Sequence, residues 1–281
     1  MLFRSMIGSI ALAIVLVAGP VAAQQPLDDS SKYPNMAGQW LRVGPLGVFD
    51  STKPPGLGQQ APLTPEYQKI FEANLADVAQ GGSGDDPVHT CIPEGMPRAM
   101  NLVLPMEFII TRNTTYILME YLSMLRRVYT DGRPFPDDED PSWMGYSIGK
   151  WIDEDGDGRY DALEVETRDL KNPRTFDPSG LPVHKDGETV VKERFYLDQA
   201  NPDILHDQIT TMDHALTRPW TVLKTMRREK KPIWVESICS EGNVHVSIGG
   251  EQYMLGGDGL LMPFRKGQPP PDLRHFDQPK K

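Results

Sequence analysis

The chain has 281 residues and a formal net charge of −10 at pH 7, with 39 acidic against 29 basic side chains. This acidic balance excludes the basic surface that binding to nucleic acid or to an anionic membrane requires. Gly and Pro are plentiful, at 25 and 26 copies, which favours short elements joined by turns over long helices. The length suits one large β domain or two small ones with a substantial apolar core.

The first 23 residues have the pattern of a secretory signal peptide. A short start that carries Arg4 precedes an apolar run from Ile7 to Ala18, and small residues end the segment at Ala23. We expect cleavage after Ala23, because the apolar run is shorter than the ~20 residues of a membrane-spanning helix. The mature chain is then expected to be periplasmic or secreted, with no membrane anchor.

The cysteines Cys91 and Cys239 would meet an oxidising compartment after export. One disulfide between them is the economical interpretation. It would close a loop of about 147 residues and remove roughly 4 to 5 kcal/mol of unfolded-state entropy in the chain-entropy model. Two separate buried thiols are the alternative, since unpaired Cys is also common in protein cores.

Residues 24–62 are rich in Pro, Gly, Gln and Ser and are expected to form an extended arm, with a first strand at 38–43. Thr64 followed by Pro65 is the pattern of a helix N-cap with Pro at the first helical position. Apolar residues then recur at helical spacing as far as Ala79, which predicts one helix over 64–79.

Short alternating segments predict a series of strands in the rest of the chain. They are 106–111, 115–121, 125–129, 145–151, 163–167, 189–197, 205–212, 220–227, 233–239, 244–249 and 251–255. Residues 63–264 are therefore expected to form a mainly β domain, an antiparallel meander that closes as a barrel or sandwich with one N-terminal helix. The Pro-rich segment 265–281 is expected to be a peripheral tail.

The residues from Asp153 to Glu164 match every position of the calcium-loop pattern D-x-[DN]-x-[DN]-G-x5-E. The expected ligands of a structural Ca²⁺ are the side chains or carbonyls of Asp153, Asp155, Asp157, Arg159, Asp161 and Glu164. The flank 146–151 contains β-favouring Tyr, Ile and Trp, and the flank 163–167 alternates apolar and polar residues, so we expect this loop to cap a β-hairpin. A solvated acidic turn is the alternative, because Asp and Gly dominate turns. No organic cofactor is expected.

No motif of a serine hydrolase, dinucleotide-binding protein, P-loop protein, thioredoxin or zincin occurs in the sequence. Glu193 lies on the apolar face of the strand 189–197, where burial would raise its pKa and suit an acid or base. His184 lies in a turn-rich loop over which a ligand can enter. With Arg194 as an anion stabiliser, these residues form a candidate catalytic set. The alternatives are a charged residue on an exposed or edge strand for Glu193 and a solvated loop histidine for His184.

Arginines and aromatic residues are mixed along the predicted strands. In a β scaffold such a mixture lines a pocket for an anionic or aromatic ligand, or holds loops together by hydrogen bonds and stacking. The ligand-binding candidates are Arg127, Tyr129, Arg133, Trp151 and Trp220.

Five motifs resemble those of a family of exported bacterial proteins to which no reaction is assigned. They are Cys91-Ile-Pro-Glu-Gly-Met-Pro-Arg98, Tyr129-Thr-Asp-Gly-Arg133, Gly145-Tyr-Ser-Ile-Gly-Lys-Trp151, Glu193-Arg194-Phe195 and Thr217-Arg-Pro-Trp220. The resemblance extends roughly over 40–245 and carries no information about activity.

Gly38-x-Trp40 and Tyr129-Thr130-Asp131 are similar to signatures of the lipocalins. That resemblance implies a barrel with a central cavity for a small apolar molecule. The early helix, the calcium-type loop and the long excursions 131–141 and 170–188 depart from the lipocalin pattern. The sequence thus predicts an exported, lipocalin-like barrel that binds a small apolar or aromatic molecule. The alternative is a cofactor-independent periplasmic lyase, isomerase or hydrolase.

Overall fold

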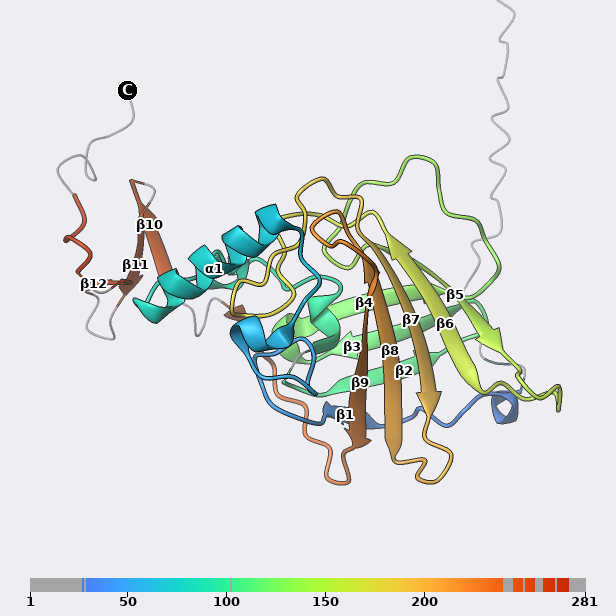
Figure 1. The fold of residues 1–281 in the computed structure, drawn as a ribbon. Coiled ribbons are helices and arrows are strands. Elements are labelled where there is room, and N and C mark those ends of the chain that lie inside the picture. Colours follow the sequence, from blue (N-terminus) through green and yellow to red (C-terminus); the bar gives the residue numbers. More distant parts are fainter. Residues whose placement is uncertain are drawn as a thin grey trace, which may run out of the picture.

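A computed structural model of the protein describes residues 27, 29–101, 103–239, 245–249, 251–255, 260–265 and 267–272. The expected signal peptide lies outside the described residues. Nine strands close into a barrel (Figure 1). They are β1 (Gln39–Arg42), β2 (Met106–Ile110), β3 (Thr114–Met119), β4 (Met124–Tyr129), β5 (Tyr146–Ile152), β6 (Ala162–Arg168), β7 (Val190–Leu197), β8 (Ile204–Met212) and β9 (Trp220–Arg228).

The barrel follows the expected meander, because strands that are consecutive in sequence are neighbours in the sheet. It closes where β9 pairs antiparallel with β1, which places Trp40 opposite Arg228. The one departure is β4 and β5, which pair in parallel with Val128 opposite Ser147. The reason is the excursion 130–145, which returns the chain to the end where β4 began. The prediction of a mainly β, barrel-like fold is confirmed.

The strand directions sort the connections into two ends of the barrel. At one end, which we call the loop-rich end, lie the segments 43–105, 120–123, 169–189 and 213–219. At the opposite end lie the connections 111–113, 153–161 and 198–203. The calcium-type hairpin between β5 and β6 and the β6–β7 loop, which contains His184, are therefore at opposite ends of the barrel.

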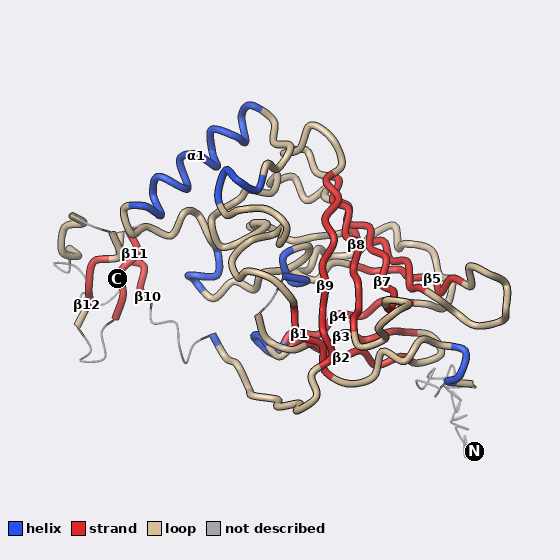
Figure 2. Tube along the Cα trace, turned by 60° about the horizontal axis from the view of Figure 1, so that its bottom comes forward, coloured by secondary structure: helices blue, strands red, loops and turns tan. Residues whose placement is uncertain are grey.

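The one α-helix among the described residues, α1 (Pro65–Ala79), begins and ends as its sequence predicts. The Thr64 side chain accepts a hydrogen bond from the Tyr67 amide at 3.4 Å, which satisfies one free donor of the first turn. Phe71 faces the core, and Asn74 donates to the Gly180 carbonyl at 2.8 Å. These contacts fix α1 beside the barrel, among the loops of the loop-rich end (Figure 2).

Five short 3₁₀ helices accompany α1 in the described residues. They are η1 (Ser30–Lys32), η2 (Gly56–Gln59), η3 (Pro87–Thr90), η4 (Arg98–Asn101) and η5 (Tyr121–Ser123). Three of them, η2, η3 and η4, lie in the long β1–β2 connection together with α1. This connection therefore folds back repeatedly on itself at the loop-rich end.

The predicted strand 233–239 is wrong, because the structure has no ladder there. The Ile233 amide donates to the Gln39 side chain at 3.1 Å and the Val235 amide to the Glu120 side chain at 2.8 Å. Side chains thus take the hydrogen bonds that a neighbouring strand would need. The later strands β10 (His245–Ile248), β11 (Glu251–Leu255) and β12 (Leu261–Pro263) form a separate sheet rather than part of the barrel.

Large side chains fill the barrel, and Trp40, Phe195 and Met226 are among those that are completely buried. Cys91 and Cys239 form the expected disulfide across 148 positions of sequence, with their Cα atoms 5.6 Å apart. It ties the segment that follows β9 to the β1–β2 connection. In the part of the chain that the structure describes, no helix is long and apolar enough to span a bilayer.

Candidate functional site

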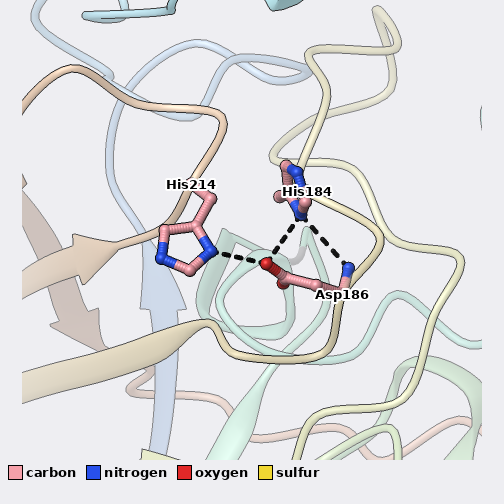
Figure 3. A group of neighbouring side chains, drawn as sticks. All are labelled: His184, Asp186 and His214. Atoms are coloured by element: carbon pink, nitrogen blue, oxygen red, sulfur yellow. Dashed lines mark hydrogen bonds and ion pairs between the residues drawn. The ribbon is translucent and has the colours of Figure 1, made fainter.

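Two imidazoles and one carboxylate meet at the loop-rich end of the barrel (Figure 3). His184 and Asp186 lie in the β6–β7 loop, and His214 lies in the β8–β9 loop. Asp186 Oδ2 is 2.8 Å from His184 Nδ1 and 2.5 Å from His214 Nδ1. We call these three residues the rim cluster.

Asp213 and Tyr67 hold His184 in place. The Asp213 carboxylate accepts hydrogen bonds from the His184 amide at 2.9 Å and from the Thr189 hydroxyl at 2.6 Å. The Tyr67 ring, on α1, packs against the His184 imidazole with the ring centroids 5.2 Å apart. The two loops and α1 therefore position the imidazole together, which is the support that a binding site needs.

Asp186 is charged at neutral pH. Partial burial by itself would raise the pKa of Asp186, but hydrogen bonds from the Glu188 amide and from both imidazoles lower it to about 2. The hydrogen bond that the His214 imidazole donates to this carboxylate raises the pKa of His214 in turn. The rim cluster thus presents a full negative charge between two ring nitrogens.

His184 Nδ1 has two partners on Asp186, and the protonation of the ring selects between them. With a proton on Nδ1, the imidazole donates to Asp186 Oδ2 at 2.8 Å. Without that proton, Nδ1 accepts a hydrogen bond from the Asp186 amide at 3.2 Å and has a lone pair that can bind a metal ion.

The geometry of the rim cluster fits a transition metal. One ligand atom from each residue lies within 4.8 Å of the other two. Tetrahedral metal–ligand bonds of about 2.0 to 2.2 Å place the ligand atoms roughly 3.3 to 3.6 Å apart, so Asp186 Oδ2 and the two ring nitrogens need to separate by about 0.5 to 1.1 Å. Two imidazoles and a carboxylate suit Zn²⁺, Cu²⁺ or Fe²⁺, and three protein ligands leave a position open for a further ligand.

A hollow adjoins the rim cluster. Its volume is about 230 Å³, and His214 forms part of its wall. The other lining residues combine apolar and polar side chains, among them Met212, Leu216, Thr217 and Arg218. A molecule in this hollow would contact His214.

The candidate catalytic residues lie in three separate places. Glu193 points into the barrel, where both of its carboxylate oxygens bind the Arg126 guanidinium, at 2.8 Å for Oε1 and Nη1. Arg194 points outward and donates to Glu164 at 3.0 Å and to Glu154. His184 belongs to the rim cluster. These three side chains do not share a pocket.

The ligand-binding candidates are also dispersed. Arg133 stacks on Tyr129 with 4.0 Å from its guanidinium carbon to the ring centroid, and Arg127 is exposed on the outer face of β4. Trp151 packs on Tyr33 near the hairpin, with ring centroids 5.2 Å apart. Trp220 is buried against Phe49 and Phe176. Their contacts are stacking and packing within the protein.

The barrel interior contains charged side chains as well as apolar ones. Arg126 and Lys224 are both buried inside it, and Arg126 also donates to Thr167 Oγ1 at 2.8 Å. These side chains occupy the space in which a lipocalin-like barrel would hold an apolar molecule. The described residues also form hollows outside this interior, one of about 440 Å³ over the outer face of β5 to β8 and one of about 230 Å³ beside His214.

The calcium-type loop is folded as a tight turn at the tip of the β5–β6 hairpin. Asp153 accepts hydrogen bonds from the Gly156 and Gly158 amides at 2.8 and 3.0 Å. Oxygen atoms of Asp153, Asp155 and Asp161 lie within 4.8 Å of one another. Three of the expected ligands therefore converge, whereas Glu164 lies in β6 and binds Arg194.

Sequence reasoning singled out His184 but did not connect it with Asp186 and His214. The sequence contains the spacing His184-x-Asp186. The strands predicted on either side of Asp213-His214 imply a loop there, at the same end of a meandering barrel as the loop that contains His184. Topology supplies the missing link, because β6–β7 and β8–β9 connections of a meander leave the barrel on the same side.

No known protein family and no curated protein matches the chain.

Proposed function

We propose that this protein is an exported β-barrel protein that binds a divalent transition-metal ion through His184, Asp186 and His214 and takes up a small molecule in the adjoining hollow. The observation that carries the proposal is the convergence of one carboxylate oxygen and two imidazole nitrogens from separate loops, at 2.5 and 2.8 Å. Export rests on the signal-peptide pattern and agrees with the disulfide.

The residues around the rim cluster define what would bind beside the metal. A bound divalent ion would supply Lewis-acid chemistry, polarising an oxygen of the ligand or lowering the pKa of a bound water. Asp213 would hold the backbone of His184 through its amide, and the Tyr67 ring would support the imidazole itself. The charge of Asp186 offsets part of the charge of the ion.

The hollow favours a small, mostly apolar or aromatic molecule with an oxygen donor. Met212, Leu216 and Pro219 supply apolar surface, and Arg218 supplies a positive charge for an anionic group. A volume of about 230 Å³ limits the ligand to little more than one ring. These properties support small-molecule binding at the rim.

The second part of the proposal is a structural Ca²⁺ in the hairpin loop. Asp153, Asp155 and Asp161 would supply carboxylate oxygens, which suit Ca²⁺ and fit it better than a soft transition metal. The loop lies at the opposite end of the barrel from the rim cluster. Calcium there would fix the hairpin and not take part in chemistry at the rim.

The test of the rim site is a Co²⁺ titration of the purified mature protein in excess Ca²⁺, followed by visible absorption. We expect one equivalent of Co²⁺ with the absorption of a nitrogen- and oxygen-ligated ion. His184→Ala and His214→Ala should each weaken binding by about 100-fold or more, since each removes one of three ligands. His206→Ala is the matched control, because His206 contacts Asp198 at 3.4 Å outside the cluster. Equal affinity in all variants would refute the site.

A further inference from the structure

A separate cavity of about 230 Å³ lies at the loop-rich end of the barrel and shares no lining residue with the hollow beside His214. Its wall comes from the β1–β2 connection, from η5 and from the β6–β7 loop. The polar residues in that wall are Asp86, Glu94, Arg98, Asn101 and Tyr121. Apolar surface comes from Val88, Val103 and Pro178. We call this cavity the Glu94 pocket.

Acidic groups outnumber basic ones in the Glu94 pocket. Among the described residues that line it, Arg98 is the one cation, against the carboxyl groups of Asp86 and Glu94. Arg98 donates to both carboxylate oxygens of Asp86, at 2.6 and 3.1 Å, and to the Thr175 hydroxyl at 2.7 Å. The distance from Arg98 Nη2 to Glu94 Oε1 is 4.0 Å. Arg98 thus directs its hydrogen bonds to Asp86 and Thr175 rather than to Glu94.

Glu94 is a buried carboxyl group with one oxygen left over. Its exposed fraction is 3%, and among the described residues Oε2 has no hydrogen-bond partner. A buried acceptor without a partner costs free energy, which a donor that enters the cavity would recover. The loss of hydration around Glu94 already belongs to the folded state. A cation that binds there therefore gains the attraction to the carboxylate without that further cost.

A small organic ammonium ion fits the Glu94 pocket better than a metal ion does. A metal ion needs several ligand atoms close together, and the described residues bring three such groups together at the rim cluster and in the hairpin loop, not here. A primary ammonium group has three N–H donors, and the oxygens of Glu94 and Asp86 can accept from them. The apolar part of the wall suits an apolar body attached to the ammonium group.

We propose that the Glu94 pocket binds a small primary amine in its ammonium form, with Glu94 Oε2 accepting a hydrogen bond from the ammonium group. The apolar body of the amine lies against Val88, Val103 and Pro178. The volume of about 230 Å³ admits one ring with a short substituent. An anionic ligand is disfavoured by the same two carboxyl groups that attract the cation. Val103 is 45% exposed, so the ligand can enter from solvent beside it.

The test compares benzylamine, which is protonated at neutral pH, with benzyl alcohol, in which a neutral hydroxyl replaces the ammonium group. Binding to the mature, disulfide-bonded protein is measured by titration calorimetry. We expect benzylamine to bind at least about tenfold more tightly, since hydrogen bonds between charged groups are roughly twice as strong as neutral ones. Proton NMR should show contacts between the benzylamine ring and the methyl groups of Val88 and Val103. Equal affinities, absent ring–methyl contacts or no binding at millimolar benzylamine would overturn the proposal.

Variants locate the ammonium group beside Glu94. Glu94→Gln keeps the size of the side chain and removes its charge, so the affinity for benzylamine should fall about tenfold, to that for benzyl alcohol. Glu166→Gln is the matched control and should leave both affinities unchanged, because Glu166 pairs with Arg168 and Lys192 on the outer face of β6. The thermal midpoint shows whether each variant remains folded. Unchanged benzylamine binding in Glu94→Gln would contradict the proposal.

Two further variants separate the shape of the pocket and the rim cluster from the charge of Glu94. Val103→Trp adds bulk at the exposed edge of the cavity and should weaken the binding of both ligands; unchanged affinities would place the amine elsewhere and refute the pocket. Asp186→Ala, in the rim cluster, should leave benzylamine binding unchanged. A loss of binding in Asp186→Ala alone would assign the amine to the rim cluster and overturn the proposal, whereas failure of metal binding at the rim has no bearing on the Glu94 pocket.

Discussion

Replacing Glu193 by Ala tests the interpretation that this residue stabilises the barrel rather than performing chemistry. The side chains of Glu193 and Arg126 are both 0% exposed, and the guanidinium also binds Ser147 and Thr167. Glu193→Ala removes the carboxylate that pairs directly with that buried guanidinium and leaves only Asp207 as a nearby buried carboxyl group, which costs about 3 to 5 kcal/mol. For a domain of this size, such a loss lowers the thermal midpoint by roughly 6 to 20 °C.

The assay is urea unfolding followed by circular dichroism, with two comparisons. Glu166→Ala removes one partner of a solvent-exposed pair with Arg168 and should cost less than about 1 kcal/mol. The double variant Arg126→Met with Glu193→Leu should recover most of the lost stability, because a hydrophobic pair leaves no unpaired charge. A loss below about 1 kcal/mol in Glu193→Ala would refute the reasoning.

Three further predictions concern the hairpin loop, the disulfide and a buried lysine. Excess Ca²⁺ should raise the unfolding free energy by about 2.7 kcal/mol at 100 times Kd, and Asp153→Asn should abolish the rise; an unchanged midpoint in EDTA would contradict the calcium site. Replacing Cys91 and Cys239 by Ser should lower the free energy of unfolding by roughly 4 to 5 kcal/mol, measured by urea unfolding. An unchanged midpoint would show that the disulfide does not stabilise the protein. Burial lowers the pKa of Lys224 from 10.5 to about 7 in the folded state. Between these values the unfolded chain binds the extra proton, so stability should rise with pH from about 7 to 10.5. Lys224→Met should flatten this rise of stability with pH. Equal slopes of unfolding free energy against pH in the two proteins would contradict the lowered pKa of Lys224.

The sequence was sufficient for the local elements of the barrel. Alternation of apolar and polar residues located its nine strands to within one or two residues, because each strand buries one face. Thr64 and Pro65 located the start of α1 for an equally local reason. The pairing of Cys91 with Cys239 followed from compartment and count.

The remaining features depend on contacts that alternation does not encode. The segment 233–239 has an alternating sequence, yet its amides bind Gln39 and Glu120, which are distant in the chain. The direction of β5 depends on the path of a long loop. The rim cluster depends on two loops meeting at one end, and Glu193 finds its partner Arg126 across the barrel, 67 positions away.

The most direct test of the account is X-ray absorption spectroscopy of the protein loaded with one equivalent of Zn²⁺ in excess Ca²⁺. The account predicts two imidazole nitrogens and at least one oxygen at about 2.0 to 2.2 Å from the zinc, with imidazole scattering lost in the variant that replaces His184 and His214 by Ala. A first shell of oxygen atoms alone, unchanged in that variant, would contradict the metal site at the rim of the barrel.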